Sequence, residues 1–189
     1  ELVGRIEVQN DGPDGDITVP ARKLVDICKS LPDGVDIAFS VEDGRVTVTA
    51  GRSRFTLSTL PAAEFPTVEA GEGEIDLELA QTLVRQMIDR TGFAMAQQDV
   101  RYYLNGMYME IKEGRLRFVA TDGHRLALCT APGQVEADDK SVIVPRKGVL
   151  ELSRLLDADG SVTLTVGSNH IRAATDQFTF TSKLIDGKF

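Results

Sequence analysis

Residues Val19–Lys29 read VPARKLVDICK, and residues Val144–Arg154 read VPRKGVLELSR. Their prolines, Pro20 and Pro145, stand 125 residues apart (145 − 20), and both stretches carry apolar residues at helical spacing. A proline suits the start of a helix because its missing N–H needs no partner in the first turn. The two stretches therefore predict a repeated amphipathic helix.

The likeness continues downstream of each helix. Phe55–Thr59 resembles Phe178–Ser182 at an offset of 123 residues (178 − 55). Between helix and match, both copies alternate apolar and polar residues, as in Val46–Thr49 and Val162–Val166, which is typical of half-buried strands. Each copy is predicted to be a helix followed by antiparallel strands, so the fold class is α+β with tandem repeats.

The first residue of the chain corresponds to a position in the middle of a repeat. With a period of about 124 residues from these offsets, Glu1 corresponds to a residue near His124, inside a strand of the first copy. The stretch from about Glu72 to Cys129, which includes an apolar helical pattern over Ala80–Ile88, has no earlier counterpart. We expect a matching first half-domain to precede Glu1.

Composition excludes several classes of protein. Apolar residues make up 42% and charged residues 26% of the 189, the ordinary balance of a globular protein. The formal charge of −8 argues against a surface that binds DNA everywhere, although a basic stripe on an acidic protein remains compatible with DNA binding. No apolar run approaches the roughly 20 residues of a membrane helix, so we expect a cytoplasmic protein without membrane contact.

The two cysteines, Cys28 and Cys129, stand among apolar neighbours and without a nearby Cys or His at metal-ligand spacing. We interpret both as buried free thiols. No metal or cofactor site is predicted.

Four longer segments carry a family resemblance: Asp99–Met107, Ala120–Ala127, Val142–Gly148 and Phe178–Leu184. They resemble segments of the bacterial sliding clamps, the β subunits of DNA polymerase III, in the same order and at the same spacing. The resemblance implies three similar domains per subunit and a homodimeric ring, with helices lining the hole and antiparallel sheets outside. It assigns residues 1–71 to the later half of the first domain and 72–189 to the second, with the third domain absent. This chain alone should not close a ring.

The resemblance also implies a DNA-facing surface. Charges on a helix face usually serve solubility, and paired tyrosines more often serve packing, but basic residues recur on both helices. We predict contacts to duplex DNA of any sequence from Arg22, Lys23, Lys29, Gln98, Tyr102, Tyr103, Arg146, Lys147 and Arg154.

The segment Asp122–Arg125 is the nearest approach to a catalytic cluster, because a histidine can act as a base that an aspartate orients. No nucleophile or phosphate loop accompanies it. In the family, the matching positions instead form a pocket for a short linear peptide carried by partner proteins. The residues here are Leu104, Thr121, Gly123, His124, Arg125 and Leu126.

The sequence thus predicts a non-catalytic processivity factor that encircles duplex DNA. Implied partners are the DNA polymerase III catalytic subunit, the clamp loader, and repair and translesion polymerases. Two alternatives stay open: a protein-interaction scaffold that forms no ring, and an enzyme built on His124 and Asp122.

Overall fold

The computed structural model describes residues 1–66 and 73–189. These form two compact units: a smaller one over Val8–Thr67, and a larger one that joins Glu1–Glu7 to Val68–Phe189. The domain boundary expected between residues 71 and 72 lies outside the described residues.

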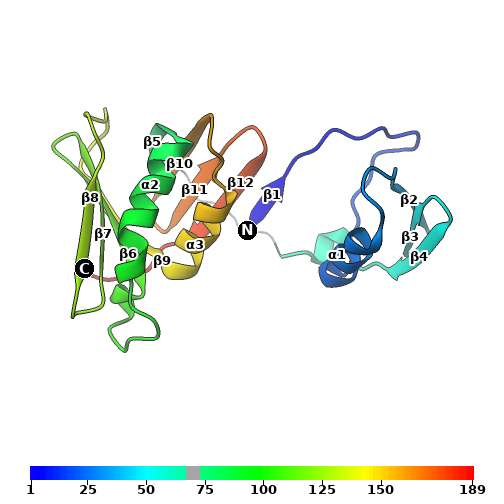
Figure 1. Ribbon diagram of the computed structural model, residues 1–189, viewed down its shortest axis with the longest axis horizontal. Coiled ribbons are helices and arrows are strands. Elements are labelled where there is room, and N and C mark those ends of the chain that lie inside the picture. Colours follow the sequence, from blue (N-terminus) through cyan, green and yellow to red (C-terminus); the bar gives the residue numbers. More distant parts are fainter. Residues whose placement is uncertain (67–72) are drawn as a thin grey trace. The chain divides into compact units, whose positions relative to one another are not determined.

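In each of the two copies a helix is followed by antiparallel strands, as predicted (Figure 1). The smaller unit contains α1 (Ala21–Ser30), β2 (Ala38–Glu42), β3 (Arg45–Ala50), β4 (Ser53–Ser58) and the 3₁₀ helix η1 (Ala62–Glu64). The larger unit contains β1 (Leu2–Gly4), β5 (Gly73–Ala80), α2 (Gln81–Thr91), η2 (Gly92–Ala94), η3 (Tyr102–Leu104), β6 (Gly106–Lys112), β7 (Arg115–Thr121), β8 (Leu126–Thr130), β9 (Lys140–Pro145), α3 (Arg146–Leu155), β10 (Ser161–Gly167), β11 (His170–Ala174) and β12 (Phe178–Lys183).

The smaller unit is one helix on one sheet. Strands β2, β3 and β4 form an antiparallel sheet in that order. Its core consists of Val46, Val48 and Leu57, against which Leu24 and Ile27 of α1 pack. The helical spacing of these two residues places them on one face of α1, as the sequence predicted.

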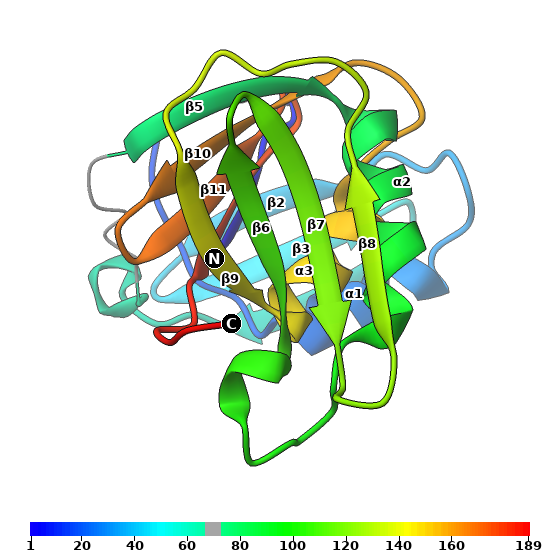
Figure 2. The same ribbon diagram turned by 90° about the vertical axis from the view of Figure 1, so that its left-hand side faces the viewer.

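Two antiparallel sheets form the larger unit, one in the order β1-β12-β11-β10-β5 and one in the order β8-β7-β6-β9. Figure 2 looks onto the four-stranded sheet. Val84, Met87 and Ile88 of α2 and Val149 and Leu152 of α3 are buried in the core that the inner faces of both sheets share. The two helices also contact each other.

The two helix-and-sheet copies have the same internal register, which corrects one expectation. Val48 pairs with Phe55 in the smaller unit, and Ala173 pairs with Phe180 in the larger one. Both positions are 125 residues apart (173 − 48 and 180 − 55), the offset of the helices. The expected match of Phe55 with Phe178 was therefore wrong by two residues.

One cysteine also differs from expectation. Cys129 is buried, but Cys28 is exposed. Cys28 follows Ile27 on α1, and the described part of the smaller unit brings only Leu24 and Ile27 of that helix against the sheet. A residue with apolar neighbours in sequence can stay exposed when the sheet surface that faces its helix is small.

The shared core of the larger unit makes a stability test possible. Leu164 of β10 is 1% exposed, so Leu164→Ala leaves a cavity and should lower the free energy of unfolding by about 2–5 kcal/mol. Val100 lies in a loop and is 94% exposed, so Val100→Ala should change it by less than about 0.5 kcal/mol. Urea unfolding measures both. Equal effects would contradict this assignment of the core.

Candidate functional site

Two neighbouring segments of the larger unit carry most of the predicted site residues. One is the loop from Gln98 to Tyr103, which precedes β6, and the other is the turn from Thr121 to Leu126 between β7 and β8. The guanidinium Nη2 of Arg101 in the loop donates to the backbone oxygen of Asp122 in the turn at 3.4 Å. Residues 21 apart in sequence therefore meet in one place.

The turn is closed by its own side chains. The Thr121 hydroxyl donates to the Arg125 carbonyl oxygen at 2.7 Å and accepts from the Gly123 N–H at 3.1 Å. Asp122 Oδ1 accepts from the N–H groups of His124 and Arg125, both at 3.0 Å. Gly123 has φ of +88°, a conformation that residues with a Cβ rarely adopt. The turn is thus set by local hydrogen bonds.

These contacts also set the charge of the turn. Backbone N–H groups, that of His124 first, lower the pKa of Asp122 below its usual value, so its carboxylate stays ionised. Asp122 Oδ2 accepts from Arg125 Nε at 3.0 Å, and Arg125 Nη2 reaches the Phe93 carbonyl oxygen at 2.8 Å. The Arg125 guanidinium carbon also lies 5.4 Å from the centre of the Phe93 ring. Arg125 therefore ties the turn to η2.

These donors occupy the carboxylate of Asp122, the group that would have to orient His124 in the catalytic alternative. Both of its oxygens accept from the backbone or from Arg125. The other histidine of the chain, His170, lies in β11, where its Nδ1 is 2.6 Å from Asn169 Oδ1. Among the described residues, no three His, Cys, Asp or Glu side chains gather as metal ligands. Nor does any described helix have the length and apolar character to cross a membrane.

The loop is held by an ion pair at its centre. Arg101 donates from Nε to Asp99 Oδ1 at 3.0 Å and from Nη2 to Asp99 Oδ2 at 2.8 Å. The hydrogen bond from Arg101 holds the pKa of Asp99 at about 2. Asn105 closes the loop by donating to the Asp99 carbonyl oxygen and accepting from the Asp99 N–H, both at 2.9 Å.

The predicted aromatic residues of this loop differ in exposure. Tyr102 is 59% exposed, whereas Tyr103 is half-buried and meets Tyr102 edge to face at 6.0 Å between ring centres. Gln98 is exposed and has φ of +57°. Gln98 and Tyr102 are thus accessible to a ligand.

The predicted peptide-site residues also differ in exposure. Gly123, His124 and Arg125 are exposed, and Leu126 is 64% exposed. Leu104 is 6% exposed, with its N–H bonded to the Arg101 carbonyl oxygen. Leu126 is therefore the accessible apolar side chain of the set, whereas Leu104 is buried.

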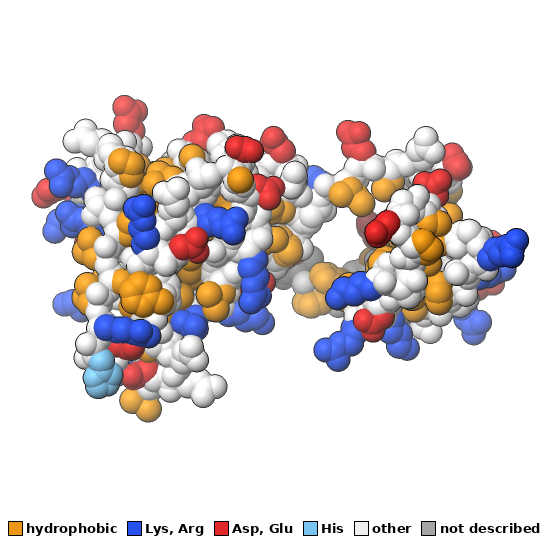
Figure 3. All heavy atoms as spheres, viewed as in Figure 1, with side chains coloured by type: hydrophobic (Ala, Val, Ile, Leu, Met, Phe, Trp, Pro, Cys, Tyr) orange, Lys and Arg blue, Asp and Glu red, His pale blue; other side chains and the backbone are white. Residues whose placement is uncertain are grey.

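The basic residues lie on both helices, and Figure 3 shows Lys and Arg side chains over the helices of each unit. At the offset of 125 residues, Arg22 matches Lys147 and Lys29 matches Arg154. All four are exposed, and Arg154 also pairs with Glu151 at 2.9 Å. Two cationic positions per helix therefore recur on equivalent turns.

The other two basic positions do not recur. Lys23 matches Gly148, which is buried. A side chain has no room there, because a Cβ would lie 2.7 Å from Ser182 Oγ. Arg146 matches Ala21 and is half-buried, with its Nη1 3.3 Å from the Met95 carbonyl oxygen. Two of the three basic positions on each helix therefore match at this offset.

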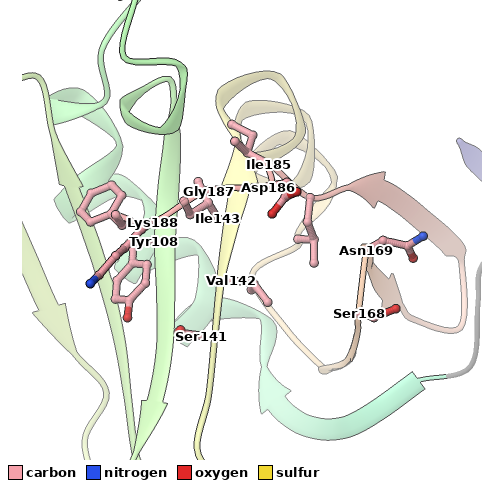
Figure 4. Close-up of a pocket in the computed structure, with 12 residues that line it drawn as sticks. Tyr108, Ser141, Val142, Ile143, Ser168, Asn169, Ile185, Asp186, Gly187 and Lys188 are labelled. Carbon is pink, nitrogen blue, oxygen red and sulfur yellow. The ribbon is translucent and has the colours of Figure 1, made fainter.

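A cavity of about 580 Å³ lies beside the segment that follows β12 (Figure 4). Tyr108 and Ile143 of the four-stranded sheet, Asn169 of the β10–β11 turn, and Ile185 and Lys188 line it. None of the predicted peptide-site residues does. Sequence reasoning missed this cavity, and it missed Arg101 and Asp99, because no local pattern marks the contacts that they make.

Comparison with known families identifies both halves of the chain. Residues 78–189 match the model of the DNA polymerase III beta subunit, central domain, and residues 1–69 match that of the N-terminal domain of the same subunit. The beta sliding clamp of Pseudomonas aeruginosa is 61% identical over 191 residues, and that of Escherichia coli K12 is 51% identical over 190.

Solved structures that resemble this chain are sliding clamps as well. The crystal structure of the DNA polymerase III subunit beta from Pseudomonas aeruginosa superposes with a TM-score of 0.95 at 60% identity, and that of the sliding clamp from Caulobacter crescentus with 0.89 at 41%. A Pseudomonas aeruginosa clamp bound to griselimycin gives 0.94.

In each of these comparisons the whole of this chain is matched, and it spans 52% of the relative's length. The match therefore extends over both units and not over a shared motif alone. The chain belongs to the DNA polymerase III β subunit family, the bacterial sliding clamps.

Proposed function

We propose that the full-length protein containing this chain is a DNA polymerase processivity factor that encircles duplex DNA and tethers its partners. The observation that carries the proposal is a strand pairing between repeats. Leu2–Gly4 of β1 pairs antiparallel with β12 at the edge of the five-stranded sheet. At the offset of 125 residues, β1 matches Ala127–Cys129 within β8.

This pairing supplies a rule for assembly. A β8-type strand of one repeat pairs with the β12-type edge of the next, and unpaired strand edges readily accept such a strand. Among the described residues, β8 and β4 lie at sheet edges, and β4 matches β12 in the repeat. Head-to-tail contacts of this kind close into a ring when the rotation between repeats permits it.

The domain organisation follows from the same rule. We assign residues 1–71 to the later half of a first clamp domain and 72–189 to a second. A third domain and a second subunit complete the ring in the family's manner. Action on DNA places the protein in the cell interior, and the cytoplasmic location remains a prediction.

The inner surface would contact DNA through its phosphates. Arg22, Lys29, Lys147 and Arg154 are exposed at equivalent places on equivalent helices of a chain whose formal charge is −8. Phosphate contacts carry no sequence information, which suits a protein that slides. Gln98 and Tyr102 add an exposed polar and an exposed aromatic group, and an aromatic ring stacks on any base.

The outer site would bind a short peptide from partner proteins. Leu126 offers exposed apolar area, and His124 and Arg125 stand beside it on a turn that is already closed by hydrogen bonds. Such a turn loses little conformational freedom when it binds. We propose that the DNA polymerase III catalytic subunit, the clamp loader, and repair and translesion polymerases share this site, and that it performs no catalysis.

The second candidate is a scaffold that binds the same peptides without encircling DNA. Retention on DNA separates the two, because a ring leaves linear DNA by its ends but stays on a closed circle. We expect the loaded full-length protein to elute with circular DNA and to dissociate after the circle is cut once. Equal loss from cut and uncut DNA would favour the scaffold.

The DNA-facing assignment makes a prediction about salt. Lys147→Gln in the full-length protein should weaken binding to short duplexes of any sequence. It should also reduce the slope of log affinity against log salt by about 0.9, the contribution of one phosphate contact. Fluorescence anisotropy over a salt series measures the slope. Arg115→Gln, at an exposed position at the start of β7, is the control, and an equal change in both variants would refute the assignment.

The peptide site makes a separate prediction. Leu126→Ala should weaken binding of a polymerase-tail peptide to the full-length protein about ten- to a hundredfold. Burying a leucine side chain contributes about 1.5–3 kcal/mol, and about 1.4 kcal/mol equals a factor of ten. Calorimetric titration measures the affinity. Leu60→Ala is the matched control, because Leu60 is 67% exposed in the smaller unit. Unchanged affinity in Leu126→Ala would place the site elsewhere.

A further inference from the structure

The DNA-facing loop and the peptide-binding turn are joined by one side chain. Arg101 lies between Gln98 and Tyr102, the exposed residues proposed to meet DNA, and its Nη2 donates to Asp122 within the turn at 3.4 Å. The same nitrogen donates to Asp99 Oδ2 at 2.8 Å. One guanidinium therefore contacts both segments at once.

This arrangement requires the shape of arginine. Nε and Nη2 form a fork that holds both oxygens of Asp99, while Nη2 still reaches the turn. A lysine ammonium is a single compact charge and cannot span these acceptors in the same geometry. The turn is also shaped for this contact, because a Cβ on Gly123 would lie 2.9 Å from Arg101 Nη2.

The far end of the loop is anchored as well. Asn105 makes two hydrogen bonds of 2.9 Å with the backbone of Asp99, and its own carbonyl oxygen accepts from the Arg146 N–H at 2.9 Å. Arg146 is the first residue of α3. An unbroken chain of hydrogen bonds thus runs from the start of α3 through Asn105, Asp99 and Arg101 to the turn.

The central link is exposed to water. The side chain of Arg101 is 47% exposed and that of Asp99 is 21% exposed. Ion pairs of this kind contribute little to stability and compete with solvent. A ligand that immobilises the neighbouring Gln98 and Tyr102 would therefore hold the pair in place, and through it the turn.

We propose that Arg101 couples the two sites, so that duplex DNA held against the loop increases the affinity of the turn for a partner peptide. The proposal rests on the proposed function. DNA orders the loop and the turn together, so a peptide that binds afterwards has less disorder to remove. By linkage, the peptide strengthens DNA binding by the same factor.

The test measures peptide affinity of the full-length protein with and without a saturating short duplex. A polymerase-tail peptide should bind the wild type about fivefold or more tightly when DNA is present, the lower end of typical coupling between sites. In Arg101→Lys this ratio should fall to one, although the charge is kept. Asp99→Asn, which removes the partner of the fork, should also lower the ratio.

Arg115→Lys is the matched control, because it makes the same chemical change at an exposed position at the start of β7, and it should keep the wild-type ratio. Thermal unfolding checks that each variant is folded. The ratio separates coupling from direct contact. If Arg101 only touched the peptide, Arg101→Lys would weaken binding equally with and without DNA, and the proposal would be overturned.

A wild-type ratio of one, with both ligands bound, would also overturn the coupling while leaving the proposed function intact. Failure of the wild type to bind peptide or DNA at all would instead contradict the proposed function.

Discussion

The contact of α3 with the inner faces of both sheets is the interaction on which the larger unit depends. Val149 and Leu152 of α3 lie in the same interior as Val84 of α2, Phe118 of β7 and Leu164 of β10. Apolar side chains on one face of the helix remove water from two sheets at once, which is the main stabilising term in such a core. The opposite face of α3 is thereby left to solvent, with Lys147 and Arg154 on it.

The close approach of α3 to β12 has a further consequence. Gly148 leaves room for Ser182 where any larger side chain would collide. In the smaller unit, α1 packs on fewer partners, and the matched position carries Lys23, which is exposed. The two helices therefore carry their cations at partly different positions, because the tightness of packing decides which positions have room for a side chain.

Hydrogen bonds and ion pairs fix the shape of the candidate site, whereas apolar burial stabilises the core. The turn at Thr121–Leu126 and the loop at Gln98–Tyr103 contain little buried apolar area, so carboxylates and backbone groups fix their shapes instead. Asp99 and Asp122 each accept several hydrogen bonds, and these bonds lower the pKa of both. Segments held in this way stay accessible to a ligand while keeping a defined geometry.

The sequence by itself determined the repeated helix and strands, the α+β class and the recurrence of basic residues on both helices, because these follow from local periodicity along the chain. It could not determine which residue of β4 corresponds to which residue of β12 in the repeat, since a shift of two residues keeps every side chain on the same face of its sheet. The exposure of Cys28, the burial of Leu104 and the bridge from Arg101 to Asp122 were decided only by the tertiary structure. Each of them depends on contacts between residues far apart in sequence, and such contacts leave no local pattern along the chain.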